Sequence, residues 1–316
     1  MKTSIDYLKF RTRSSPFDVL EALRPAFGSA ASLVELGDCV KGKDGWEHRR
    51  HLRIAGDVSI GAIDYGGESQ REWVRVDIPG SGCAWIQDWA KVVGLLDVLK
   101  EPALKRVDIA LTTYDGSISH EVVIAAHEAR QFSSGGRHPH RRVITSSDAR
   151  AGRTVYVGRR EGSKFFRAYE KGHEILQKHV PAWMHSGVTQ LEFDGHGLAN
   201  VEDVYRVEVE FKDEDGKVMP WTMLTNPDSY FVGAYPFCAA LLPGAPERKV
   251  QTMPDFGPRM ALLAQLEHAR RAYGSILRTA IDAFDGDRDL VLSMITSDKP
   301  SERLISAGVL TVVHQG

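Results

Sequence analysis

The sequence has few cysteines, no long apolar run and almost no net charge, and each absence excludes a class of protein. The three cysteines (Cys39, Cys83 and Cys238) are scattered and form no CxxC pair. They provide neither a disulfide framework nor a thiolate zinc site, and they fit a reducing cytoplasm. No apolar run approaches the roughly 20 residues that span a bilayer. The opening MKTSIDYLKFRTRS alternates polar and apolar residues, unlike a signal peptide.

Nucleotide-binding loops are also absent. The sequence contains neither GxxxxGK[ST] nor GxGxxG, the glycine-rich turns that hold nucleotide phosphates. A nucleotide-using enzyme is therefore disfavoured, and the chain carries no ATP-driven motor of its own. Its 316 residues, 42% hydrophobic and 26% charged, are ordinary for a globular protein with one large domain or two modest ones.

Charge is balanced overall but unevenly distributed. The net charge of −2 is unlike that of a nucleic-acid-binding domain, which is usually basic. Within residues 137–171, however, basic residues far outnumber the acids Asp148, Glu161 and Glu170. A second basic cluster lies in KGKDGWEHRRHLR, residues 41–53. One such run is ordinarily a solvated surface, but the longer one surrounds the residues with the strongest catalytic pattern.

The periodicity predicts an α+β fold with a curved, mainly antiparallel sheet, helices on one face and a small helical C-terminal region. The predicted strands are Ser4–Arg11, a glycine-punctuated meander within His51–Ile86, Arg106–Gly116, and the segments RTVYVGRR, KFFRAYEK and YRVEVEFK. The predicted helices are Pro16–Leu23, capped by Ser15, then Asp88–Leu99, Ser119–Phe132 and Arg259–Phe284. We expect an α+β catalytic domain at residues 1–250 and a mainly helical region at 251–316, which is a candidate for origin recognition.

Several of these strands carry reactive side chains on one face. Because side chains alternate along a strand, each of these strands has an apolar side and a polar side. The residues of interest on the polar sides are Asp108, Arg167, Tyr169, Lys171, Glu208 and Glu210. A half-exposed sheet with a polar outer face explains any single strand. The occurrence of such side chains on several successive strands favours a functional site on the sheet.

The chemistry of these residues is coherent. Two or three carboxylates from neighbouring strands, drawn from Asp108, Glu208 and Glu210, provide oxygen ligands for Mg²⁺ or Mn²⁺. Such an ion polarises a phosphodiester. Arg167 and Lys171 flank Tyr169, and positive charge there favours the phenolate that a nucleophile needs.

The order RVDIAL … GRTVYVGRREGSKFFRAYEKG … YRVEVEFK, followed by RRAYG, resembles the replication initiation factor family. These proteins start rolling-circle replication of filamentous phages and small plasmids, and related relaxases mobilise integrative elements. The resemblance runs from about Ser4 to Phe284 and is most specific at Thr154–Lys171. It implies sequence-specific single-strand nicking and rejoining through a 5′-phosphotyrosyl intermediate, which leaves a 3′-OH primer.

The resemblance assigns roles to individual residues. It implies that Tyr169 is the nucleophile, that Asp108 and Glu208 are the metal-binding acids with Glu210 as a third, and that Arg167 and Lys171 are the flanking cations. The partner is DNA at a replication origin. A host helicase and polymerase are expected because the chain has no motor, and no membrane partner is expected. A homodimer is left open.

DNA contact is expected from two basic groups, the long basic run and the C-terminal helix. The candidates are Arg141, Arg142, Arg153, Arg159, Arg160, Lys164, Arg270 and Arg271. Tyr156 and Tyr205 are rival nucleophiles. Tyr205 belongs to an apolar face and is expected in the core, whereas Tyr156 shares the polar face as a candidate base-stacking ring.

Two other functions stay open at this point. A metal-dependent endonuclease that uses water would form no covalent adduct with DNA. A non-enzymatic DNA-binding regulator would carry the acids as surface charges and would not nick DNA with any metal.

Overall fold

The computed structural model describes residues 2–56, 58–133, 137–148, 151–193, 195–214, 219–250 and 258–300. The chain divides into two compact units, Met1–Thr252 and Met253–Gly316. None of the helices formed by the described residues combines the length and apolar character needed to cross a lipid bilayer.

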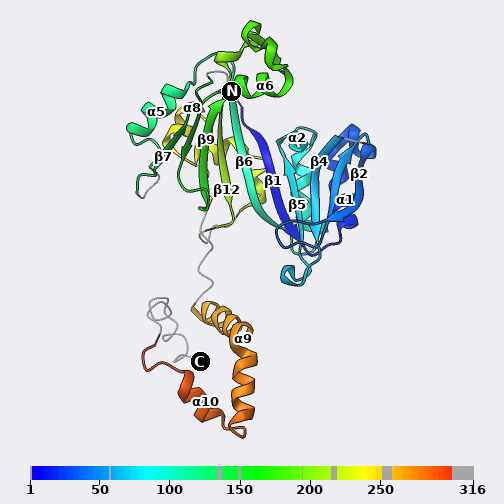
Figure 1. Cartoon of the computed structure of the whole chain (residues 1–316), viewed down its shortest axis with the longest axis vertical. Coiled ribbons are helices and arrows are strands. Elements are labelled where there is room, and N and C mark those ends of the chain that lie inside the picture. The colour runs from blue at the N-terminus through cyan, green and yellow to red at the C-terminus, as the bar shows by residue number, and fades with distance from the viewer. Residues whose placement is uncertain are drawn as a thin grey trace. The chain divides into compact units, whose positions relative to one another are not determined.

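The first unit is built on one antiparallel sheet of ten strands, with β1 (Ser4–Thr12) and β6 (Ala103–Thr113) side by side at its middle (Figure 1). Its other strands are β2 (Val34–Lys41), β3 (His48–Ile54), β4 (Val58–Tyr65), β5 (Val74–Pro79), β7 (Arg141–Ile144), β8 (Thr154–Val157), β9 (Lys164–Glu170) and β12 (Tyr205–Lys212). A small hairpin pairs β10 (Gln190–Phe193) with β11 (Gly197–Asn200). The predicted α+β class with a mainly antiparallel sheet is confirmed.

The sheet repeats one topology on both sides of its middle. Outward from β1 the order is β5, β4, β3, β2, and outward from β6 it is β12, β9, β8, β7. In each half the central strand is followed by a helix and then by the outermost strand, and the chain returns strand by strand toward the middle. The two halves are therefore related as topological copies, joined at the β1–β6 pair.

Helices connect the strands. Those of the first unit are α1 (Pro16–Leu23), α2 (Gly80–Cys83), α3 (Trp89–Val93), α4 (Leu95–Val98), α5 (His120–Glu128), α6 (Lys171–His179), α7 (Pro227–Val232) and α8 (Pro236–Leu241). Short 3₁₀ segments lie at η1 (Arg24–Leu33), η2 (Glu68–Gln70), η4 (Ala182–Gly187), η5 (Val201–Asp203) and η6 (Trp221–Met223). α1 begins as predicted, because Ser15 accepts a bond from the Asp18 backbone in a capping box.

The core lies on the apolar face of the sheet. Buried side chains of α1, α5, α7 and α8 join those of the strands in one cluster. Phe132 contacts Phe166 of β9 at a ring-centroid distance of 4.7 Å, and Tyr235 and Phe237 complete this aromatic group. Burial of this face leaves the opposite face to the polar side chains.

Two predicted elements differ in the structure. The predicted helix Asp88–Leu99 is divided at Gly94 into α3 and α4, since glycine is a poor helix former. The last run of the predicted meander, GCAWI, begins in α2 and continues as turn, not as a strand.

The second unit contains α9 (Pro258–Ala283) and α10 (Arg288–Ile295), which is capped by Asp287. Its helical character agrees with the periodicity of the sequence.

Candidate active site

Strand β9 carries Arg167 and Tyr169 on the polar face of the sheet. In the register, Tyr169 lies opposite Arg206 of β12 and Thr154 of β8. The alternating pattern places Phe166 and Ala168 on the other side, where both are fully buried. β9 ends at Glu170, and α6 starts at once with Lys171, so the helix begins two residues after the tyrosine.

The hydroxyl of Tyr169 donates a hydrogen bond to Glu208 Oε1 at 2.6 Å. Arg167 binds the other oxygen of the same carboxylate, with its Nε 2.8 Å from Oε2. Glu208 is 2% exposed, so this carboxylate is held by a phenol and a guanidinium away from water. A buried carboxylate needs such partners to keep its charge.

The electrostatics differ from the sequence expectation for Tyr169. Burial, and then the negative charge of Glu208, raise the pKa of its phenol above the ordinary value of 10.0, although Arg206 opposes them. The flanking cations lie near the ring, with Arg167 Cζ at 5.5 Å and Lys171 Nζ at 5.6 Å from its centroid. Both, however, pair with carboxylates, Arg167 with Glu208 and Lys171 with Glu174. The phenol therefore stays protonated until a base takes its proton.

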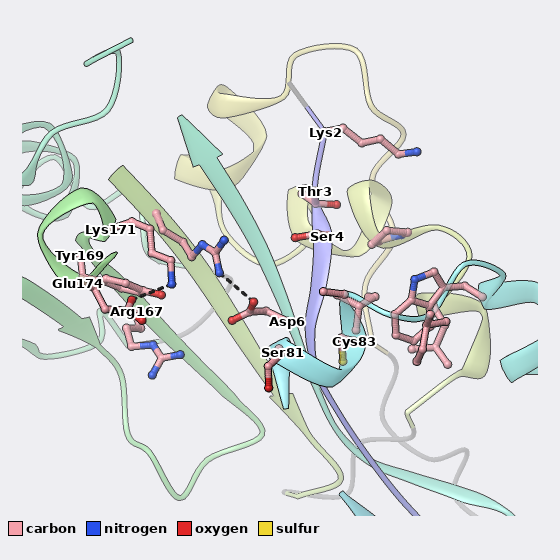
Figure 2. Close-up of a pocket in the computed structure, with 18 of the residues that line it drawn as sticks. Lys2, Thr3, Ser4, Asp6, Ser81, Cys83, Arg167, Tyr169, Lys171 and Glu174 are labelled. Carbon is pink, nitrogen blue, oxygen red and sulfur yellow. Dashed lines mark hydrogen bonds and ion pairs between the residues drawn. The ribbon is translucent and has the colours of Figure 1, made fainter. Parts of the chain in front are cut away.

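Tyr169 opens onto a cavity of about 1100 Å³. Figure 2 shows Arg167, Tyr169, Lys171 and Glu174 on one side of this cavity and Asp6 and Ser81 on the other. Among the described residues its charged lining consists of Lys2, Asp6, Arg167, Lys171, Glu174, Lys178 and Arg206. Cations thus outnumber carboxylates around the tyrosine, as a site for phosphate requires.

Arg206 fixes the position of Asp6, which lies across the cavity from Tyr169. Its guanidinium donates to Asp6 Oδ1 at 2.8 Å and to Thr112 Oγ1 at 2.8 Å, which ties β12 to β6 and β1. Burial raises the pKa of Asp6, and Arg206 opposes this effect. On the near wall, Lys171 Nζ lies 2.8 Å from Glu174 Oε2. Although burial acts in the other direction, this bond lowers the pKa of Glu174.

The three predicted metal ligands come together on the sheet but are neutralised by protein cations. Asp108 lies opposite Glu210 in the register. Arg106 binds both oxygens of Asp108, at 2.8 and 2.6 Å, and reaches Glu210 at 2.8 Å. The second oxygen of Glu210 lies 2.5 Å from Lys212.

Burial raises the pKa of Asp108 to about 6, and the charges of Glu210 and Glu208 add to this effect while Arg106 opposes it. Within the described part of the chain, no three acidic, histidine or cysteine side chains form a metal-holding group. The donor chemistry is that of a divalent-ion site, but guanidinium groups, an ammonium group and the Tyr169 phenol occupy the carboxylate oxygens. The arrangement as it stands does not fit an ion.

The predicted DNA-binding cations do not share one face. Arg142 lies opposite Tyr156 on the polar face, whereas Arg141 binds Glu128 and the carbonyl of Ile124 on α5. Arg153 is held by Glu170 and Glu121.

Lys164 lies over the ring of Tyr235 on the helix-covered face. Arg159 and Arg160 are exposed in the β8–β9 turn. Arg270 is exposed on α9, and the side chain of Arg271 lies outside the described residues.

The structure adds residues to the site that sequence reasoning missed. Arg206 belongs to the same polar face as Glu208, so its alternation offered a signal. Asp6 and Lys2 reach the cavity only because β1 pairs with β6, and nothing local in the sequence indicates this. The rival tyrosines fall as expected: Tyr205 is 2% exposed in the core, and Tyr156 lines the cavity.

Residues 102–252 match the model of a family described as replication initiation factor. The match covers β6, β9 and β12, and with them Asp108, Tyr169 and Glu208. Among solved structures, the chain is similar to a rolling circle replication initiator protein from Geobacillus stearothermophilus, with 16% identity and a TM-score of 0.48 over 76% of this chain and 84% of that one. No curated protein matches the chain.

Proposed function

We propose that the protein is a rolling-circle replication initiator that nicks one DNA strand with Tyr169 and remains attached to the 5′ end. The observation that carries this proposal is the bond from the Tyr169 hydroxyl to Glu208 at the wall of a cation-lined cavity. A half-buried phenol that ionises by transfer of its proton to an adjacent carboxylate suits a nucleophile paired with its base.

The reaction would proceed as an in-line displacement. The phenolic oxygen forms a bond to phosphorus while the bond from phosphorus to the 3′ oxygen breaks, and the phenolic proton moves to Glu208 Oε1, 2.6 Å away. The departing 3′ oxygen takes a proton from solvent, and Glu208 later returns its own. Because one phosphodiester replaces another, the step is reversible and also permits rejoining.

The cavity cations serve phosphate. Arg206 and Lys171 line the cavity with Tyr169 and would hold the non-bridging phosphate oxygens, while Arg167 keeps Glu208 oriented. The same cations offset the repulsion between the phosphate and the charge that develops on the phenolic oxygen, so their position matters to the rate. The free 3′-OH would be the primer for a host polymerase. A host helicase in the same compartment would supply the motor that the chain does not carry.

A divalent ion is a separate part of the proposal. Mg²⁺ or Mn²⁺ would bind Asp108, Glu210 and Glu208 only in exchange for the guanidinium, ammonium and phenol groups that now hold them. When bound, it would polarise the phosphodiester. Titration of adduct formation with Mn²⁺, in wild type and in Asp108→Asn, tests this part. Equal metal dependence in both proteins would place the ion elsewhere.

The experiment for the nicking function is incubation with supercoiled DNA, followed by a denaturing gel. The DNA carries the replication origin of the phage, plasmid or integrative element that encodes the protein. Wild type should give nicked DNA linked to protein. Tyr169→Phe should abolish both products while DNA binding is retained, because only the phenolic oxygen is removed.

Tyr156→Phe is the matched control, since Tyr156 lines the same cavity and its variant should still form the adduct. A covalent product from Tyr169→Phe would contradict the assignment and make Tyr156 the next candidate. Thermal melting of both variants checks that each remains folded.

A further inference from the structure

The polar face of the first half of the sheet carries arginines and carboxylates on neighbouring strands, as the catalytic half does. In the second half, Glu208 of β12 lies opposite Arg167 of β9. At the topologically equivalent strands of the first half, Arg75 of β5 lies opposite Asp64 of β4. β5 also carries an acid, Asp77, two residues after Arg75 on the same face. This half also precedes the family match at residues 102–252.

The charges on this face do not cancel. Asp64 is fully buried and is shared by two guanidinium groups, with Arg49 Nε at 2.6 Å and Arg75 NH2 at 2.8 Å. Against the effect of burial, these two bonds lower the pKa of Asp64. Arg53 continues the Arg49 side of β3 and has no ion pair with any described residue. Asp77 pairs with Lys9 and Asp44 with Arg75, which leaves Arg11 and Arg53 as cations of this face without an ion pair to a described residue.

Aromatic rings lie among these cations. The guanidinium carbon of Arg11 lies 4.1 Å from the ring centroid of Trp73, and that of Arg13 lies 4.8 Å from it. Arg75 lies 5.3 Å from the ring of Trp46. Arg11 Nε is buried and has no hydrogen-bond partner among the described residues. A buried donor left without an acceptor costs free energy, so an acceptor supplied by a ligand would be favoured here.

β1 connects this face to the catalytic cavity. Its first residues, Ser4 to Asp6, line the cavity, and Arg11 lies near its other end. At about 3.3 Å per residue, Asp6 and Arg11 are about 17 Å apart along the strand. A chain of phosphates leaving the cavity along β1 would reach Trp73 and its arginines.

We propose that the arginine–tryptophan surface, formed by Arg11, Arg49, Arg53, Arg75, Trp46 and Trp73, binds the single-stranded DNA that adjoins the nick. The surplus cations complement phosphate, and the tryptophan rings offer stacking to unpaired bases. Stacking needs a base that is free of its partner, which favours a single strand over a duplex. This inference rests on the proposed nicking function, which is what would produce that single strand.

The test measures binding of fluorescein-labelled oligothymidine to the full-length chain by anisotropy, in the Tyr169→Phe background, where no adduct can form. Trp73→Ala should weaken binding about tenfold, and Trp73→Phe should restore most of it because phenylalanine also stacks. The pair Arg11→Ser with Arg53→Ser should weaken binding and reduce the salt slope by about 0.7 for each phosphate that is no longer neutralised.

Lys249→Ser is the matched control, because Lys249 is an exposed cation on the other, helix-covered face of the sheet. There it borders a cavity together with Lys164 and Phe211. It should leave affinity and slope unchanged. Unchanged affinity in both the tryptophan and the arginine variants would overturn the proposal, as would an equal fall in affinity for a duplex of the same length.

The arginine pair keeps the test decisive if Trp73→Ala does not fold. Because binding is measured without catalysis, failure of the nicking proposal would appear in the adduct gel and not here.

Discussion

At the scale of single residues, the buried and half-buried carboxylates of the site are each matched by a guanidinium. Arg106 serves Asp108 and Glu210, Arg167 serves Glu208, and Arg206 serves Asp6. Such pairs offset the cost of burying charge but add little net stability, because both partners lose their hydration. Their value at this site is position: they hold Glu208 against the Tyr169 hydroxyl.

Asp108 yields a prediction for stability. Its pKa is about 6 in the folded protein and near 3.8 in the unfolded chain, so the folded protein holds the proton more tightly. Between about pH 4 and pH 6 only the folded state keeps it, and the free energy of unfolding falls as pH rises, by about 1.4 kcal/mol per unit.

Asp108→Asn removes this dependence. From about pH 4 to pH 6.5, wild type should therefore lose about 2–3 kcal/mol relative to the variant, as measured by urea denaturation at each pH. Asp97→Asn, a change at an exposed carboxylate, is the control. A constant difference between wild type and Asp108→Asn across this range would show that Asp108 titrates alike in both states.

At the scale of elements, the junction between β9 and α6 sets the geometry of the near wall. Gly172 is the second residue of α6, and a Cβ there would lie 2.0 Å from the carbonyl oxygen of Val201 in η5. The helix can approach η5 only because this residue has no side chain. Lys171 and Glu174 are placed at the cavity by this close approach.

Gly172→Ala should therefore push α6 away from η5 and lower the free energy of unfolding by about 1–3 kcal/mol. It should also slow adduct formation, since Lys171 would move relative to Tyr169. Gly187→Ala is a suitable control, because its Cβ would meet nothing within 4 Å among the described residues. Melting curves and adduct time courses decide the matter, and wild-type values for Gly172→Ala in both would refute this role of the junction.

At the scale of the whole molecule, every residue of the candidate site lies in the unit Met1–Thr252. A protein ending at Thr252 should melt cooperatively and still attach to a single-stranded oligonucleotide through Tyr169. If the C-terminal helices recognise the origin, this shortened protein should bind origin and scrambled duplexes with equal affinity. Retained preference for the origin would assign recognition to the sheet unit instead.

Much of the structure could be predicted from local patterns in the sequence. Alternation with a period of two placed Arg167 and Tyr169 on one side of β9 and Glu208 on one side of β12, since side-chain direction depends only on the strand itself. Ser15 and Pro16 marked the start of α1 for the same reason: capping involves groups within a few residues. The resemblance carried by residues 152–172 and 205–212 led to the family that the comparison supports.

Tertiary structure alone decided which partners meet. The register between β9 and β12 joins Tyr169 to Glu208, and Arg206 reaches Asp6 across 200 positions of sequence. The same strand pairings place the predicted metal ligands in ion pairs: Asp108 and Glu210 with Arg106, and Glu208 with Arg167. The topological repeat appears only in the strand order of the folded sheet. Strand neighbours far apart in the chain are chosen by the packing of the whole sheet, which no local pattern encodes.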